Sequence, residues 1–191
     1  MTSQLLPGRL EQVIDTLIQE SQPPSVLVID MQEYVERMHS TEGFPYPSFL
    51  RTVERQGEVL YYAKKMELPI FLVEFSKKTF GKTLPQLTAL LRGYRNKKII
   101  SKRGSSAFYQ TRLQSLLEEK PIREKQPLVL MGFHISDCVF RTAEDAHERG
   151  HQVITAPSVL LPPYAPELIS PFYYKQCKFY DDCFPKLEVE S

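Results

Sequence analysis

The sequence predicts a three-layer α/β/α domain, that is, a mainly parallel open sheet with helices on both faces. Short, nearly continuous apolar runs alternate along the chain with longer amphipathic segments. Strands that are apolar along their whole length are buried on both faces, which is typical of a parallel sheet covered by helices. The regular alternation of such strands with helices indicates right-handed crossover connections.

Each element follows from its local pattern. Strands are predicted at residues 25–30, 68–75, 97–101, 127–133 and 151–156. Helices are predicted at residues 51–66, 84–94, 109–119 and 138–149, and Gly150 is a typical residue for the end of the last one. An earlier helix has one apolar face, made of Leu10, Val13, Ile14, Leu17 and Ile18. We assign residues 1–24 to an N-terminal helical extension, which packs on the domain or on a second copy of it, and residues 25–191 to the α/β domain.

Composition limits the function. The chain has 24 basic and 23 acidic side chains, whereas a nucleic-acid-binding protein usually has a clear excess of Lys and Arg. No apolar run approaches the roughly 18 residues that span a bilayer, and the N-terminus lacks the apolar core of a signal peptide. We therefore expect a cytoplasmic protein that binds neither nucleic acid nor membrane. Three cysteines, Cys138, Cys177 and Cys183, leave at least one unpaired and fit reduced thiols.

Three chemically distinct side chains follow predicted strands. Asp30 ends the first strand, Lys102 follows the third, and Cys138 follows the fourth. In an open α/β sheet the ligand crevice lies at the carboxyl ends of the strands, so these residues share one edge. At the first turn of a helix, Cys138 is expected to favour its thiolate form. Each residue also has a purely structural interpretation. Asp30 could be a turn or cap residue, Lys102 could be a solvated surface lysine, and Cys138 could be a packed residue at the start of a helix.

The sequence around these residues resembles the isochorismatase-like cysteine hydrolases, a superfamily that includes nicotinamidases and carbamoylsarcosine amidases. Three blocks carry the resemblance: LVIDMQ at 27–32, KRGSSAFYQTRL at 102–113, and GFHISDCVFRTAEDAHERGHQV at 132–153. The third block is the most specific, and together the three cover roughly residues 25–158.

The resemblance implies a role for each matching residue. Cys138 is the nucleophile that forms a thioester, Asp30 is the base that takes and returns its proton, and Lys102 is the cation that holds both groups. It also implies an oxyanion hole formed by the backbone N–H groups of Cys138 and His134, next to a cis peptide bond between Phe133 and His134. Gln32 and Phe108 of the matching blocks, together with Tyr34 just after the first block, are assigned to substrate binding.

The sequence also departs from the family pattern. Where the family has an aromatic residue five positions after the aspartate, the chain has Val35, with Tyr34 one position earlier. Between the first and third strands the only histidine is His39, so the metal-binding histidines of nicotinamidases have no counterpart. Ile135 and Ser136 replace the small residues typical before the cysteine. We expect neither a metal nor a cofactor, and a substrate pocket that has been rebuilt or has decayed.

These observations favour a cysteine hydrolase that cleaves a C–N, amide-type bond in a small molecule. The alternatives are a catalytically idle scaffold or binding protein, and an isochorismate-type vinyl ether hydrolase, which would not need the thiol.

The C-terminal segment is rich in aromatic residues and proline. It either covers a sheet edge or forms a lid or subunit contact, and the resemblance implies a homodimer or homotetramer. The aromatic residues that could anchor an interface are Phe172, Tyr173, Tyr174, Phe179 and Tyr180.

Overall fold

A parallel sheet forms the centre of the molecule. The computed structural model describes residues 6–41, 43–76, 78–119, 125–162 and 177–182. Within these residues the strand order is β1-β8-β6-β5-β2-β3-β4, with β7 paired to β5, and every strand pair is parallel. The strands are β1 (Leu6–Pro7), β2 (Ser25–Ile29), β3 (Ile70–Phe75), β4 (Lys97–Lys102), β5 (Leu128–Phe133), β6 (Val153–Thr155), β7 (Leu160–Leu161) and β8 (Cys177–Asp181).

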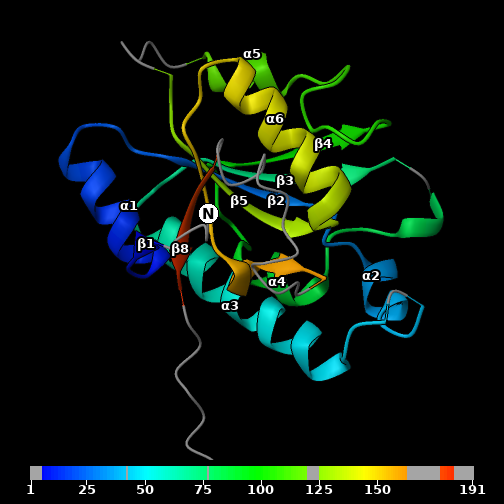
Figure 1. The fold of residues 1–191 in the computed structure, drawn as a ribbon. Helices are drawn as coiled ribbons and strands as arrows, with labels where there is room; N and C mark the ends of the chain where they lie inside the picture. Colours follow the sequence, from blue (N-terminus) through cyan, green and yellow to red (C-terminus); the bar gives the residue numbers. More distant parts are fainter. Residues whose placement is uncertain (1–5, 42, 77, 120–124, 163–176, 183–191) are drawn as a thin grey trace, which may run out of the picture.

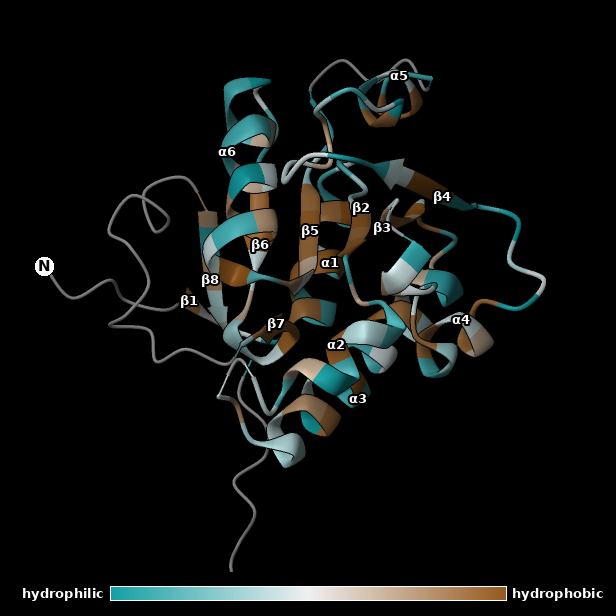
Figure 2. Ribbon diagram, turned by 90° about the vertical axis from the view of Figure 1, so that its right-hand side faces the viewer, coloured by the Kyte–Doolittle hydropathy of each residue, from teal (hydrophilic) through white to brown (hydrophobic). Residues whose placement is uncertain are grey.

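Helices cover both faces of the sheet, which confirms the predicted fold class. Helices α5 and α6 lie on one side of the sheet, and α3 and α4 lie on the other (Figures 1 and 2). Every residue of β2 and of β5 is buried, as their continuous apolarity predicts. The helices are α1 (Leu10–Gln19), α2 (Glu33–Met38), α3 (Tyr46–Lys65), α4 (Pro85–Leu90), α5 (Leu113–Leu117) and α6 (Phe140–Glu148), with short helical turns η1 (Lys78–Phe80), η2 (Ile135–Val139) and η3 (Pro157–Val159).

Four predicted helices have wrong boundaries. Helix α4 ends at Leu90 rather than at residue 94. Helix α3 begins at Tyr46 rather than at residue 51, with a proline in its first turn, where no backbone N–H is needed. Helix α5 covers only Leu113–Leu117, because residues 103–112 form a loop that is bonded to α6 instead. The helical segment before α6 begins at Ile135, as a π-helical turn, so Cys138 is not its first residue.

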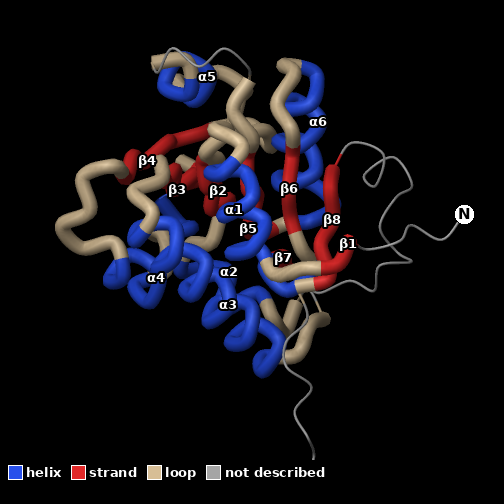
Figure 3. The backbone as a smooth tube through the Cα atoms, turned by 90° about the vertical axis from the view of Figure 1, so that its left-hand side faces the viewer, coloured by secondary structure: helices blue, strands red, loops and turns tan. Residues whose placement is uncertain are grey.

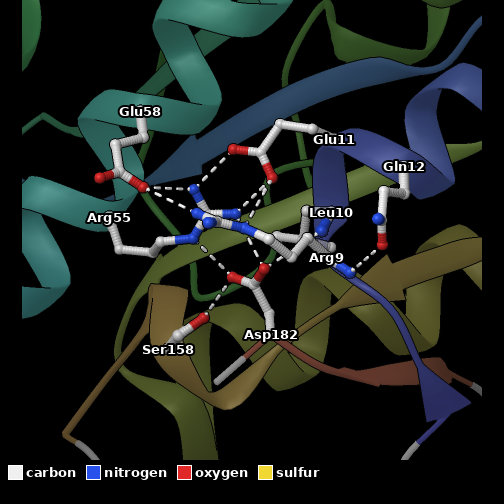
Figure 4. A network of polar contacts seen from close by, with 8 residues as sticks. All are labelled: Arg9, Leu10, Glu11, Gln12, Arg55, Glu58, Ser158 and Asp182. Atoms are coloured by element: carbon white, nitrogen blue, oxygen red, sulfur yellow. Dashed lines mark hydrogen bonds and ion pairs between the residues drawn. The ribbon is translucent and has the colours of Figure 1, made fainter. Parts of the chain in front are cut away.

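The N-terminal helix packs on its own domain. Four of the five predicted apolar residues of α1 are buried in the common core, and Ile18 packs against it while partly exposed. Arg55 of α3 is also buried, and its guanidinium binds both oxygens of Glu11 at 2.6 Å and Asp182 at 2.7 and 2.8 Å (Figure 4). One buried cation therefore joins α1, α3 and the residue that follows β8. The domain boundary near residue 24 stays a prediction.

The described part of the C-terminal segment covers one edge of the sheet. Strand β8 pairs with β6 on one side and with β1 on the other, while β4 forms the opposite edge (Figure 3). Phe179 is buried, and Tyr180 packs against the core. Phe172, Tyr173, Tyr174 and Cys183 lie outside the described residues. No helix among the described residues is long and apolar enough to cross a membrane. Assembly into a dimer or tetramer stays a prediction.

Candidate active site

Asp30 directly follows β2 at the carboxyl edge of the sheet. Its side chain is buried, with 1% exposure, and its backbone has the left-handed φ of 53° that Asp and Asn tolerate better than other side chains. The neighbouring strand β5 approaches very closely here. A Cβ added to Gly132 would lie 2.2 Å from the carbonyl oxygen of Ile29, and Gly132 has a φ of 145°. Only glycine allows this approach.

Lys102 reaches Asp30 from two strands away. It ends β4, pairs in register with Phe75 of β3, and extends its side chain over the Phe75 ring, with Nζ 4.7 Å from the ring centroid. The ammonium lies 2.8 Å from Asp30 Oδ2 and donates to the carbonyl oxygens of Gly104 at 3.1 Å and Ser105 at 2.9 Å. A buried ammonium needs such partners. The carboxylate, the two carbonyl oxygens and the Phe75 ring together fix its position.

Cys138 completes the cluster. It lies in the π-helical turn between β5 and α6, with 8% of its surface exposed, and the Lys102 ammonium donates to its Sγ at 3.2 Å. The ammonium therefore contacts both the carboxylate and the sulfur. The predicted convergence of the three strand ends is present in the structure.

The electrostatics of the cluster correct one prediction. Burial and, to a smaller extent, the Asp30 charge raise the pKa of the Cys138 thiol to about 12, because the Lys102 charge opposes them only in part. The expected depression of the thiol pKa was therefore wrong for the free protein, because desolvation outweighs the ammonium and the helix start. Burial also raises the pKa of Asp30, against the opposing effect of Lys102, which makes this carboxylate a stronger base.

The thiol and the carboxylate affect each other directly, because each is among the groups that shift the other's pKa. Neither oxygen of Asp30 receives a hydrogen bond of ordinary geometry from the described residues, so its contact with Lys102 is an ion pair. The carboxylate thus keeps lone pairs available to the neighbouring Cys138 thiol. Transfer of the thiol proton to Asp30 would leave a thiolate beside an ammonium and a neutral acid, without creating net charge.

Hydrogen bonds between the second and third sequence blocks hold the loop after Lys102 (residues 103–112) against α6 and the η2 turn that contains Cys138. Thr142 of α6 donates to the carbonyl oxygen of Cys138 at 2.7 Å and accepts a bond from the Ala107 N–H at 3.0 Å. Ser106 donates to Asp145 of α6. These bonds give a physical reason for the spacing of the two motifs, since one helix fixes both the turn that holds Cys138 and the loop that follows Lys102.

The residues assigned to substrate binding lie in different places. Tyr34 is partly buried and stacks on Phe80, with ring centroids 4.1 Å apart, and it meets the edge of Phe133 at 6.0 Å. Gln32 is fully buried, and its amide bonds the backbone of Phe75 and Gly81. Its hydrogen-bonding groups therefore organise the loop after β3.

Phe108 is also buried. It stacks with His151 at 6.0 Å and with the Arg149 guanidinium at 4.9 Å, at the far end of α6.

The Phe133–His134 peptide bond is cis, as the resemblance implies. The oxyanion role of His134 and Cys138 stays a prediction.

Sequence reasoning missed several residues around the site. Phe75 lies under the Lys102 ammonium, Phe80 stacks on Tyr34, and Phe44 packs near Phe133 with ring centroids 6.5 Å apart. Nothing local in the sequence marks these aromatic residues, because they come from three separate segments. Asp137 was also missed, although it immediately precedes Cys138 and its Oδ2 lies 3.8 Å from Sγ. Among the described residues, no group of three His, Cys, Asp or Glu side chains could hold a metal ion.

A family model for the isochorismatase domain matches residues 24–158, well over half of the chain. The chain belongs to the isochorismatase family. Asp30, Lys102 and Cys138 all lie inside the matched region of this isochorismatase-family hydrolase. Comparison with curated protein sequences gave no match.

Solved structures with the same fold are similar to the chain only at low sequence identity. The N-carbamoylsarcosine amidase from Thermoplasma acidophilum is 20% identical, with a TM-score of 0.62 over 85% of this chain and 98% of that one. The nicotinamidase from Staphylococcus aureus is 18% identical, with a TM-score of 0.57 over 72% and 81%. The MAR1 ribonuclease from Caenorhabditis elegans is 22% identical, with a TM-score of 0.61 over 81% and 72%. At such identities the likeness shows the fold, and these three proteins carry names of different activities.

Proposed function

We propose that this isochorismatase-family protein is a cysteine hydrolase that cleaves a C–N, amide-type bond in a small molecule, without a metal or cofactor. The observation that carries the proposal is the shared ammonium. Lys102 Nζ contacts Asp30 at 2.8 Å and Cys138 at 3.2 Å, and all three side chains are buried. Burial of such a charged cluster lowers the stability of the fold. A catalytic role for the three side chains would explain why the cluster is present.

The reaction begins with proton transfer. Asp30 accepts the proton of the Cys138 thiol, and the resulting thiolate is stabilised by the Lys102 ammonium. The sulfur attacks the substrate carbonyl carbon and its π electrons move to oxygen, which forms a tetrahedral oxyanion. When the carbonyl re-forms, the C–N bond breaks and Asp30 returns the proton to the leaving amine. A thioester to Cys138 remains.

Hydrolysis of the thioester regenerates the protein. Asp30, again a carboxylate, takes a proton from water, and the hydroxide oxygen attacks the thioester carbonyl. Collapse of the second tetrahedral intermediate releases the carboxylic acid and the sulfur, which recovers a proton from Asp30. A base with a raised pKa suits both half-reactions, because it accepts and returns a proton readily near neutral pH. The raised pKa of Asp30 supports this assignment.

The test is a screen of small amides for released ammonia or amine, with Cys138→Ala and a matched Cys177→Ala variant. Cys177 is another buried thiol, but burial alone accounts for its raised pKa. We expect Cys138→Ala to abolish turnover, Cys177→Ala to retain it, and mass spectrometry to find the acyl group on the Cys138 peptide. Turnover of a vinyl ether by Cys138→Ala would favour the vinyl ether hydrolase instead. Neither turnover nor acylation with any amide would favour the idle scaffold.

A further inference from the structure

A second carboxylate lies at the reacting sulfur, on its solvent side. Asp137 immediately precedes Cys138 in the η2 turn, its side chain is exposed, and its Oδ2 lies 3.8 Å from Cys138 Sγ. The first carboxylate, that of Asp30, is buried and ion-paired with Lys102. The scheme proposed above gives Asp137 no part, although any acyl group on the sulfur must come within a few ångströms of it.

The charge of Asp137 is not balanced by the described residues. The charges of Asp30 and Lys102 compensate each other at 2.8 Å, and the Cys138 thiol is neutral near pH 7 because its pKa is raised to about 12. None of the ion pairs between described residues includes Asp137, and the nearby Arg141 guanidinium pairs with Glu144. Its charge is nevertheless felt in the site, because it raises the pKa of Asp30. Counted over the part of the chain that the structure describes, one negative charge therefore remains beside the sulfur.

The aromatic residues at the same strand ends favour the same kind of ligand. Phe133 ends β5, four residues before Asp137, and its ring meets Tyr34, which stacks on Phe80; Tyr34 and Phe80 are both partly exposed. Aromatic faces attract cations. Carboxylates and aromatic rings both bind ammonium groups in proteins, whereas a carboxylate on the substrate would be repelled.

We propose that Asp137 is a specificity-determining residue that selects substrates with a positive charge on the acyl side of the scissile bond and disfavours anionic ones. The proposal rests on the function proposed above. A charge two or three bonds from the carbonyl carbon lies about 5 Å from Asp137, and Coulomb's law with effective dielectric constants of about 80 to 20 then gives a preference of about 4-fold to 300-fold.

The experiment measures the local potential without assuming turnover. Cys138 is labelled with three methanethiosulfonate reagents of similar size, one with a trimethylammonium group, one neutral and one with a sulfonate. Rates are followed on the Cys138 peptide by mass spectrometry, in the wild type, Asp137→Asn, and the matched control Glu148→Gln. Glu148 is an exposed carboxylate at the end of α6. The ratio of cationic to anionic rates is the readout, because a change in thiol pKa alters all three rates alike.

We expect the wild type and Glu148→Gln to favour the cationic reagent equally, and Asp137→Asn to lower the ratio by at least about tenfold. The same ratio in Asp137→Asn and wild type would overturn the proposal.

The substrate arm uses β-alanyl, butanoyl and succinyl amides of one fluorogenic amine. We expect the β-alanyl amide to have the highest kcat/KM, and Asp137→Asn to reduce its advantage over the succinyl amide. An equal loss for all three amides would also overturn the proposal, since Asp137 would then act in the general reaction. If no amide is hydrolysed while the labelling ratio still falls in Asp137→Asn, the proposed function fails and the charge selection by Asp137 stands.

Discussion

Replacement of Asp30 by Asn is expected to raise the rate at which the Cys138 thiol is alkylated and to lower the turnover of substrate. The substitution keeps the size of the side chain but removes both the proton acceptor and the negative charge that raises the thiol pKa. Lys102 remains 3.2 Å from the sulfur. The thiol of the variant should therefore ionise more readily and react faster with a simple alkylating reagent. Turnover should fall, because no group is left to carry the proton to the leaving amine.

The size of both effects follows from the geometry. Asp30 and Cys138 contact the same ammonium nitrogen, at 2.8 Å and 3.2 Å, so their reacting atoms cannot be far apart. At a separation of about 6 Å and an effective dielectric constant of about 20, removal of the Asp30 charge stabilises the Cys138 thiolate by about 3 kcal/mol. The thiolate population then rises about 100-fold. Loss of a positioned acid–base group lowers turnover by about 10²-fold to 10⁴-fold.

The assay compares iodoacetamide labelling of Cys138 in the wild type and in Asp30→Asn at pH 8 to 9, below the raised thiol pKa. Peptide-resolved mass spectrometry separates the thiols, and Cys177 is an internal control, because it is buried and its pKa is raised by burial alone. Unchanged, slow labelling of Cys177 shows that the variant is folded. Thermal melting is measured on the same samples, together with turnover of an amide found in the screen.

Two results would refute the reasoning. If Cys138 of Asp30→Asn is labelled no faster than in the wild type while Cys177 stays protected, the carboxylate does not act on the thiol. If the wild-type thiol is already labelled rapidly at pH 7, burial does not dominate its pKa. Wild-type turnover by a variant that melts early would instead make Asp30 a structural residue.

Three further predictions concern stability. Arg55→Met should lower the free energy of unfolding by about 3–5 kcal/mol, because the fully buried Asp182 carboxylate would lose its cationic partner; urea unfolding should show recovery when Asp182→Asn is added, and equal losses would contradict this. Burial lowers the pKa of His151, so its contribution to stability is complete above its ordinary pKa of 6.5 and is lost as the pH falls through the folded-state value. Hydrogen bonds from Arg55 and Ser158 outweigh burial and lower the pKa of Asp182, so its contribution is complete above about pH 4 and is lost on further acidification; urea unfolding across pH 3–8 that is flat below 6.5 would exclude both effects. Gly132→Ala should prevent folding, because its Cβ would lie 2.2 Å from the Ile29 carbonyl oxygen; a soluble variant that melts like the wild type would contradict the packing.

The sequence by itself determined the central sheet and the residues that converge at its edge. Continuous apolarity is a local property, and in β2 and β5 it directly reflects burial on both faces. Because the carboxyl ends of parallel strands share one edge, Asp30, Lys102 and Cys138 could be brought together without coordinates. The short strands β1 and β8 were not predicted, since they pair with segments distant along the chain and are specified by those partners.

Only the tertiary structure decided how the site behaves chemically. The sequence places Cys138 near a helix start, which favours a thiolate, but the sign of its pKa shift depends on how much water the surrounding chain excludes. Burial, together with Asp30, raises that pKa against the pull of Lys102. The path of Lys102 over Phe75 likewise depends on the register between β4 and β3. Local periodicity carries no information on either, because desolvation and register are set by residues far apart in the sequence.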